Sequence, residues 1–393
     1  MFKHNVTTTP GGIVFASDPL FLSMSAGKNV LYSSGGEEFT FLMSSAGSVN
    51  VSDVLEAWAN PLPEPSGASW LECVEDWSEN CTRRVFMYLP RQLPGTQPRE
   101  RFSTYVIPGR TSSQNRELLN GSNLFKARLL NELGNPFLST RTHKGRIILK
   151  ETELAPLYFL QDNEIAESIT LHSPTGIPPV WAESGIELLA GWTRHIGVYT
   201  IDLQKARREI FDRHGLLVSE FTIKKGGRVA AEIFIEAADP VKSRHQLRFR
   251  NSFGVFEVIE LTGELTDGVQ FVDVNSFKKF RAEFDRFDDN RRRQELESAL
   301  TVSTGPKRRR ELLHLLDALS SDEVWLLGYG LNPVRVIPEV KSVTVPERQE
   351  EPQSMELTLR RVYNEPAVMP EISKSNASYL RKIFTNVFNN QFS

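Results

Sequence analysis

The sequence predicts a mainly β protein with some α-helix, in which several β-sandwich modules are joined by short helices. Two observations predict this class. Short runs of alternating apolar and polar residues recur along the chain at a spacing of roughly 10–20 residues, and Gly, Pro, Ser and Asn separate them. The chain has 393 residues, which is more than one ordinary core holds, so we expect several domains.

Residues 1–110 are expected to form a first β-sandwich-like domain. The strand-like runs here are "GGIVFASDPLFLSMS", "EEFTFLMSS", "RRVFMYLP" and "RFSTYVIPG". "VSDVLEAW" is expected to form a short helix with Ser52 as its N-cap. Residues 111–145 follow as a polar, partly helical connector whose helical pattern ends at Gly134.

Residues 146–277 are expected to form a second β-sandwich-like domain from seven short strands. The period of two is clear in "AAEIFIEAA", where Ile233 and Ile235 alternate with Glu232 and Glu236. "IDLQKARREIFDRHG" interrupts the strands with one or two expected helical turns, which Gly215 closes.

The stretch "RHQLRFRNSFGVFEVIEL" at 244–261 predicts a hairpin, and its turn contains a phenylalanine, Phe253. Gly254 fits a turn position that needs a positive φ. We expect Glu257 and Glu260 to face the arginines of the first strand or their neighbours. Two interpretations of Phe253 stay open. It folds back over the edge of the sheet, or it sits at the tip as an interface candidate that contacts a partner.

Residues 278–393 are expected to hold a helical segment, a small β domain and a C-terminal helix. Residues 281–320 are predicted to be mainly helical, with a leucine face after Arg310. Strands are expected at "EVWLLG", "NPVRVIPE", "KSVTVPER" and "MELTLRRV". The amphipathic end of the chain docks on a neighbouring subunit or on its own domain; its interface candidates are Leu380, Ile383, Phe384, Val387 and Phe388.

Composition argues against several classes of partner. The net charge is −3, so no overall field attracts nucleic acid or an anionic membrane. Acids are interleaved with the basic runs "NRRRQ" and "PKRRRE", which favours salt bridges and makes nucleic acid an unlikely partner. No run of about 18 apolar residues occurs, so we expect no transmembrane helix. The start of the chain lacks the pattern of a signal peptide.

The usual catalytic signatures are missing from the sequence. Phosphate-binding glycine loops, the zinc-protease helix and the nucleophile elbow do not occur. "DRFDDN" at Asp285 lacks the glycine and final glutamate of a calcium loop. Cys73 and Cys81 match no zinc spacing and are expected to be ordinary thiols. The sequence therefore predicts no catalytic residue, cofactor or metal, and a protein that is not an enzyme.

Several stretches together resemble one family. They include "KETELAPLYFL", "LRFRNSFGVFEVIELTG", "RRRELLHLLDALSSDEVWLL" and "SMELTLRRVYNEP", and they lie within roughly residues 100–365. The chain resembles large β-rich proteins encoded by phages and prophages of the Bacteroides group, which look like tail or baseplate components.

The resemblance implies a non-enzymatic structural subunit of a phage tail, baseplate or neck. It implies synthesis in the cytoplasm of the bacterial host and a location in the virion, with copies of the chain in a ring and other tail or virion proteins as partners. It gives no functional residue. One alternative is a receptor- or carbohydrate-binding module of the same particle, in which Trp181 and Trp192 would stack on sugars. A cell-wall hydrolase is a further alternative.

Overall fold

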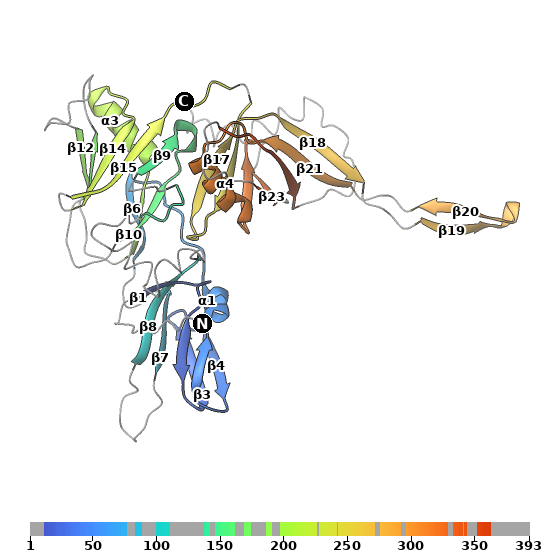
Figure 1. Cartoon of the computed structure of the whole chain (residues 1–393), viewed down its shortest axis with the longest axis horizontal. Coiled ribbons are helices and arrows are strands. Elements are labelled where there is room, and N and C mark those ends of the chain that lie inside the picture. Colours follow the sequence, from blue (N-terminus) through green and yellow to red (C-terminus); the bar gives the residue numbers. More distant parts are fainter. Residues whose placement is uncertain are drawn as a thin grey trace.

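The structure is a computed structural model of residues 1–393. It describes residues 12–76, 83–88, 100–110, 137–141, 146–161, 169–173, 186–190, 197–225, 228–241, 243–271, 276–291, 296–328, 333–340, 342–343 and 352–362. The expected class is confirmed: the chain is mainly β, with several separate sheets and a few helices (Figure 1).

The N-terminal part is a five-stranded sheet. Its order is β1 (Gly12–Phe15), β8 (Glu100–Ile107), β7 (Arg84–Tyr88), β3 (Gly27–Ser33) and β4 (Glu38–Met43). β1 runs parallel to β8 and the other pairs are antiparallel. A separate pair, β2 (Phe21–Met24) and β5 (Gly47–Asn50), lies beside it, and its Leu22 and Met24 share a core with Leu31, Leu55 and Met87.

The expected helix near residue 52 is confirmed as α1 (Ser52–Trp58), but its N-cap is Val51. Ser52 is the first helical residue, so the expected cap is wrong by one position. The reason is local. The amide of Asn50 donates to the Ser52 hydroxyl at 2.9 Å and its carbonyl oxygen accepts from the Ser52 N–H at 3.2 Å. The hydroxyl is therefore engaged by Asn50 instead of by the helix.

The expected boundary at residue 110 is crossed by a three-stranded sheet. Its order is β10 (Leu157–Gln161), β13 (Gly197–Ile201) and β6 (Leu71–Asp76), so a strand from the first 110 residues pairs with strands from the second block. Gly197 permits this pairing, because a Cβ there would lie 2.2 Å from the carbonyl oxygen of Glu75. Residues 1–110 are thus not a closed domain.

A second five-stranded sheet has the order β12 (Ile186–Ala190), β11 (Ile169–Ser173), β14 (Glu220–Lys225), β15 (Arg228–Glu236) and β9 (Arg146–Lys150). α3 (Leu203–His214) packs into the same core through Leu203, Ala206 and Ile210. Gly215 ends the helix at φ 67°, as expected. The helix is longer than the expected turn or two, because its apolar face packs on the core along most of its length. Asp202 caps its start by accepting the Lys205 N–H at 3.0 Å.

The largest sheet has seven strands, all antiparallel. Its order is β17 (Phe256–Leu261), β16 (His245–Arg250), β22 (Val324–Leu327), β23 (Val334–Glu339), β24 (Glu356–Arg361), β21 (Leu296–Ser303) and β18 (Leu265–Phe271). It joins strands from both sides of residue 277, so the expected boundary there is wrong. The hairpin expected at 244–261 is confirmed as β16–β17.

The prediction that residues 281–320 are mainly helical is wrong, because a strand at Arg286–Arg291 and β21 lie in this segment and its described α-helix is confined to Arg309–Ser320. α4 (Arg309–Ser320) packs on the seven-stranded sheet through Leu312, Leu315 and Ala318. Residues 276–291 instead form a hairpin of β19 (Ser276–Arg281), a short 3₁₀ turn (Ala282–Phe284) and β20 (Arg286–Arg291). Cross-strand pairing explains the difference, because it sets Lys278 and Lys279 opposite acids and Phe280 opposite Phe287.

Candidate interaction surface

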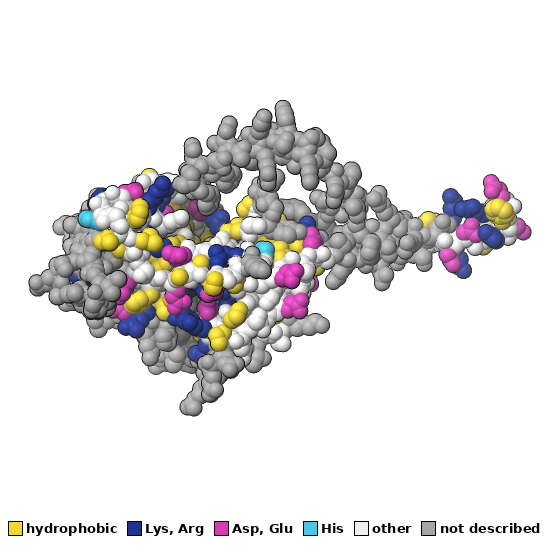
Figure 2. Space-filling view, turned by 90° about the horizontal axis from the view of Figure 1, so that it is seen from above, with side chains coloured by type: hydrophobic (Ala, Val, Ile, Leu, Met, Phe, Trp, Pro, Cys, Tyr) yellow, Lys and Arg dark blue, Asp and Glu magenta, His cyan; other side chains and the backbone are white. Residues whose placement is uncertain are grey.

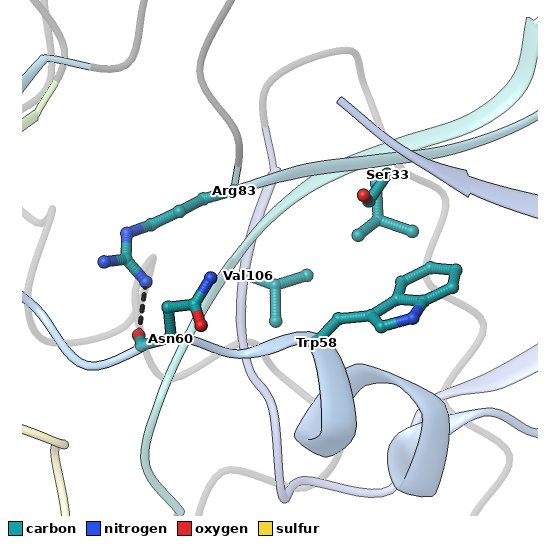
Figure 3. A pocket seen from close by; sticks show the side chains of 6 residues that line it. Ser33, Trp58, Asn60, Arg83 and Val106 are labelled. Carbon is teal, nitrogen blue, oxygen red and sulfur yellow. Dashed lines mark hydrogen bonds between the residues drawn. The ribbon is translucent and has the colours of Figure 1, made fainter. Parts of the chain in front are cut away.

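The small pocket of Figure 3 lies where α1 meets the N-terminal sheet. Ser33, Trp58, Arg83 and Val106 are among its lining residues, and its volume is about 10 Å³. That is room for about one water molecule. The arginine is already bound to the protein, since Arg83 donates to the carbonyl oxygens of Asn60 at 2.6 Å and Pro61 at 2.8 Å and pairs with Glu75. This pocket does not offer an organic ligand a charged partner.

Phe253 is buried. It is 7% exposed and packs with Ile13, Ile107 and Val255 in one cluster. The turn that carries it has Gly254 at φ 82°, as the sequence predicted. The interpretation of Phe253 as a tip that contacts a partner is therefore wrong, and it is an interior contact of the chain.

A buried network of charged side chains joins the large sheet to the loop after β9. Arg141 donates to Glu153 at 2.6 Å, and both side chains are less than a tenth exposed. Burial by itself raises the pKa of Glu153, but the charge and hydrogen bond of Arg141 hold that pKa below its usual value. Lys307 is fully buried and donates to the carbonyl oxygen of Glu260. These charges hold elements of the fold together.

The two glutamates of the hairpin differ from each other. Glu260 faces Arg244, the residue just before the arginine-bearing strand β16, as expected; its Oε2 lies 2.9 Å from Nε of Arg244. Glu257 does not face the arginines. It lies opposite Phe249 on the buried side, where the Ser139 hydroxyl donates to it at 2.5 Å and the Asn251 amide at 2.6 Å. The period of two allowed this placement, because antiparallel partners share one face.

His314 of α4 completes this buried region. It is 1% exposed, and its Nδ1 lies 2.8 Å from the hydroxyl of Thr140. Burial, together with the charges of Arg141 and Lys307, lowers the pKa of His314 well below its usual value. The imidazole is therefore neutral near pH 7 and packs edge-on against Phe249, with 5.0 Å between ring centroids. It connects the helix to the sheet.

The basic run "PKRRRE" is used inside the fold as well. Arg310 donates to Glu236 of β15 at 2.9 Å, and Arg308 lies 3.5 Å from the same carboxylate. In the run "NRRRQ", only Asn290 and Arg291 fall within the described residues. The interpretation that acids balance these arginines holds for Arg308 and Arg310, although their partner is on a strand and not on their own helix.

The feature with the character of an interaction surface is the hairpin of residues 276–291, which we call the arm. Figure 1 shows it at one end of the long axis of the molecule, apart from the larger sheets. Every described side chain from 277 to 289 is exposed except the half-buried Asp288. Its phenylalanines are 46–66% exposed: Phe277, Phe280, Phe284 and Phe287. Figure 2 shows hydrophobic, basic and acidic side chains together on the arm.

Each face of the arm combines aromatic and charged side chains. Phe280 and Phe287 lie opposite each other on one face, with 5.1 Å between their ring centroids, and Lys278 is opposite Asp289 on the same face. The other face carries Phe277 and a charged cluster, in which Asp288 lies 2.9 Å from Nε of Arg281 and 3.0 Å from Nε of Arg286. An isolated two-stranded hairpin is only marginally stable in water. Burying one phenylalanine contributes about 1.5–3 kcal/mol, so a partner that covers phenylalanines of the arm would stabilise it.

Sequence reasoning missed the arm because it predicted helix for residues 281–320, which include "DRFDDN". A signal was present. When "KKF" at 278–280 is aligned antiparallel to "FDD" at 287–289, the two lysines lie opposite the two aspartates and the two phenylalanines lie opposite each other, with a short turn between them. That mirror pattern is typical of a hairpin.

The remaining candidates fall outside the described residues. They are Leu380, Ile383, Phe384, Val387 and Phe388 of the C-terminal segment, and Trp181, Trp192 and Cys81. Cys73 lies on β6 as a free thiol. Within the described ranges, no helix is both long and apolar enough to span a membrane. Searches with protein-family models and among curated proteins found no match to the chain.

Proposed function

We propose that the chain is a non-enzymatic structural subunit of a phage tail, baseplate or neck, which assembles through contacts between its own copies in a ring and with other virion proteins. The observation that carries the proposal is the arm, whose phenylalanines are 46–66% exposed. Large apolar side chains gathered on one exposed element mark protein interaction sites.

The burial of other charged groups supports the same function. Arg141, Glu153 and Lys307 are buried inside the fold and contact protein groups. They join elements of the fold. The particle itself is suggested by the resemblance of residues 100–365 to phage tail and baseplate proteins. A location in the virion follows from that resemblance and is part of the proposal.

Replacing residues 276–291 with a short Gly-Ser turn tests the role of the arm. We expect the full-length chain to form assemblies in sedimentation velocity, while the armless variant sediments as a monomer with an almost unchanged melting temperature. Phe211→Ser is the matched control, because Phe211 is 52% exposed on α3, far along the chain from the arm. A wild-type chain that stays monomeric at its highest soluble concentration contradicts assembly from its own copies.

A further inference from the structure

We propose that the arm of one copy docks on the N-terminal sheet of a neighbouring copy, where β19 adds as an antiparallel strand to the free edge of β4. The partner is a second copy of this chain, so the proposal rests on the function proposed above. Strand addition joins backbone groups along the whole edge and uses the side chains to set specificity.

β4 is the outermost strand of its sheet, and its described partner is β3. Exposed edges usually carry a lysine, a proline or a bulge that discourages pairing. Between Glu38 and Met43, β4 has none of these and pairs in regular register with β3. Phe39 is 43% exposed and Leu42 is 81% exposed. Such an edge is open to another strand.

The other outer strands do not show this combination. Among outer strands whose side chains the structure describes, and setting the arm aside, the large exposed apolar residues lie on β4. β17 and β10 are largely buried. Two exposed features of the chain are therefore candidates for pairing with each other. One is the apolar edge of β4, and the other is the arm.

Charge selects which strand of the arm fits. β19 carries Lys278, Lys279 and Arg281 and no acid, whereas β4 and its preceding turn carry Glu37 and Glu38 and no base. β20 carries Arg286 and Arg291 as well as Asp288 and Asp289, so its charges cancel and give no net complement to these glutamates. Opposite charges across an interface favour the correct register and like charges oppose the wrong one. β19 is thus the better match.

One antiparallel register combines charge pairing and apolar pairing at three positions. It sets Arg281 opposite Glu38, Phe280 opposite Phe39, and Phe277 opposite Leu42. Because opposed residues share a face, Phe280 then extends the inner side of the sheet that Phe39 shares with Leu31. A shift by one residue would exchange the two faces and break all three pairs.

The contact must be between copies. Figure 1 shows the arm and β4 on separate parts of the molecule, so the arm does not meet the β4 of its own chain in this arrangement. A contact between two different surfaces of identical subunits is heterologous, and repetition of it closes a ring or continues as a filament. Strand addition of this kind fits the ring expected from the proposed function.

Charge reversal tests the pairing. Glu38 and Arg281 are both exposed, so Glu38→Arg and Arg281→Glu should leave the melting temperature of the sheets unchanged, and recovery in the double variant also shows that loss of the Arg281–Asp288 pair does not disrupt the arm. Each single reversal sets like charges opposite each other and should weaken assembly about tenfold or more in sedimentation equilibrium. The double variant restores an opposite pair and should recover most of the affinity. Single variants that assemble like the wild type, or a double variant that is no better than either single variant, overturn the proposal.

Cross-linking tests the register. In a Cys73→Ser, Cys81→Ser background, Thr40→Cys and Lys279→Cys are made in separate chains and mixed under mild oxidation. Opposed cysteines on neighbouring strands are close enough for a disulfide. We expect a covalent dimer from the mixture and little from either variant alone. Lys278→Cys is the control, since that residue lies on the other face of β19.

The outcomes separate the two proposals. A monomeric wild type overturns both the proposed function and this docking site. Assembly that is lost without the arm but is insensitive to the charge pair and to the cysteine pair leaves the proposed function standing and overturns the pairing with β4. An equal yield of dimer from the Lys278→Cys control also overturns the register.

Discussion

Phe253, in the turn of hairpin β16–β17, packs against Phe15 of β1, with 5.7 Å between their ring centroids. The contact joins the N-terminal sheet to the seven-stranded sheet, because both residues belong to one buried cluster. The backbones approach closely here as well. A Cβ on Gly109 would lie 2.7 Å from the carbonyl oxygen of Ser252. A phenylalanine in this turn therefore has a structural role.

Phe253→Ala should destabilise the chain by about 3–5 kcal/mol, the usual cost of truncating a buried phenylalanine. Urea unfolding followed by tryptophan fluorescence measures the change. Phe284→Ala is the control, because Phe284 is 59% exposed at the tip of the arm and its loss should leave the unfolding midpoint in place. Equal effects of the two variants would contradict the burial of Phe253.

Gly254→Ala should destabilise the chain more than Gly36→Ala does. Both glycines have a positive φ, 82° and 94°, so both substitutions strain the backbone to a similar degree. Only at Gly254 would the new Cβ collide with the chain, 2.5 Å from the carbonyl oxygen of Pro108, while nothing lies within 4 Å at Gly36. We expect about 1 kcal/mol or less at Gly36 and a clearly larger loss at Gly254. Chemical unfolding of the pair isolates the collision.

Local patterns predicted the elements whose cause is local. Alternation predicted β16 and β17, and Gly215 predicted the end of α3 because a helix end needs a residue with positive φ. Pairings between distant strands were not predictable in this way. β6 pairs with β13 across more than a hundred residues, and no periodicity within either strand specifies that partner.

The arm was only partly predictable for a related reason. Its charged and aromatic residues are compatible with a helix and with a hairpin until the bases are aligned with the acids. The register of β19 and β20 provides that alignment and shows a hairpin. The sequence left two interpretations of Phe253 open, because a residue in a turn belongs to no helical or strand periodicity. Its burial depends on the packing of β1 against the turn.

Glu153→Gln should destabilise the chain by about 3–5 kcal/mol, because it leaves the buried guanidinium of Arg141 without its anionic partner. Glu232→Gln is a matched control. It removes the partner of Arg146 at a similar separation, 2.8 Å, but at a site where the two side chains are 62% and 34% exposed. Exposed pairs of this kind contribute about 0–1 kcal/mol. Denaturant unfolding of both variants should therefore show a small effect only for the exposed pair.

Asp317 of α4 should make stability depend on pH through its contact with the same turn. Its carboxylate accepts the Ser252 N–H at 3.1 Å. Burial, with the nearby charge of Glu257, raises the pKa of Asp317 from 3.8 to about 6. The folded chain therefore binds this proton more tightly than the unfolded chain does. The resulting stabilisation is complete below pH 4 and is lost as pH rises through about 6, up to about 3 kcal/mol in total.

Asp317→Asn removes the titration but keeps a carbonyl oxygen that accepts the Ser252 N–H. At pH 7.5 we expect this variant to be more stable than the wild type by about 1–3 kcal/mol, whereas near pH 4 the two should be equal within about 1 kcal/mol. Urea unfolding at intervals between pH 4 and pH 8 measures the difference, which should grow mainly between pH 4 and pH 6. The difference in unfolding free energy between Asp317→Asn and the wild type cancels the contribution of carboxylates that are present in both proteins, such as Glu153. Asp212→Asn, at an exposed position of α3, controls for the loss of one negative charge. A constant offset between Asp317→Asn and the wild type across this range would show that Asp317 does not titrate near pH 6.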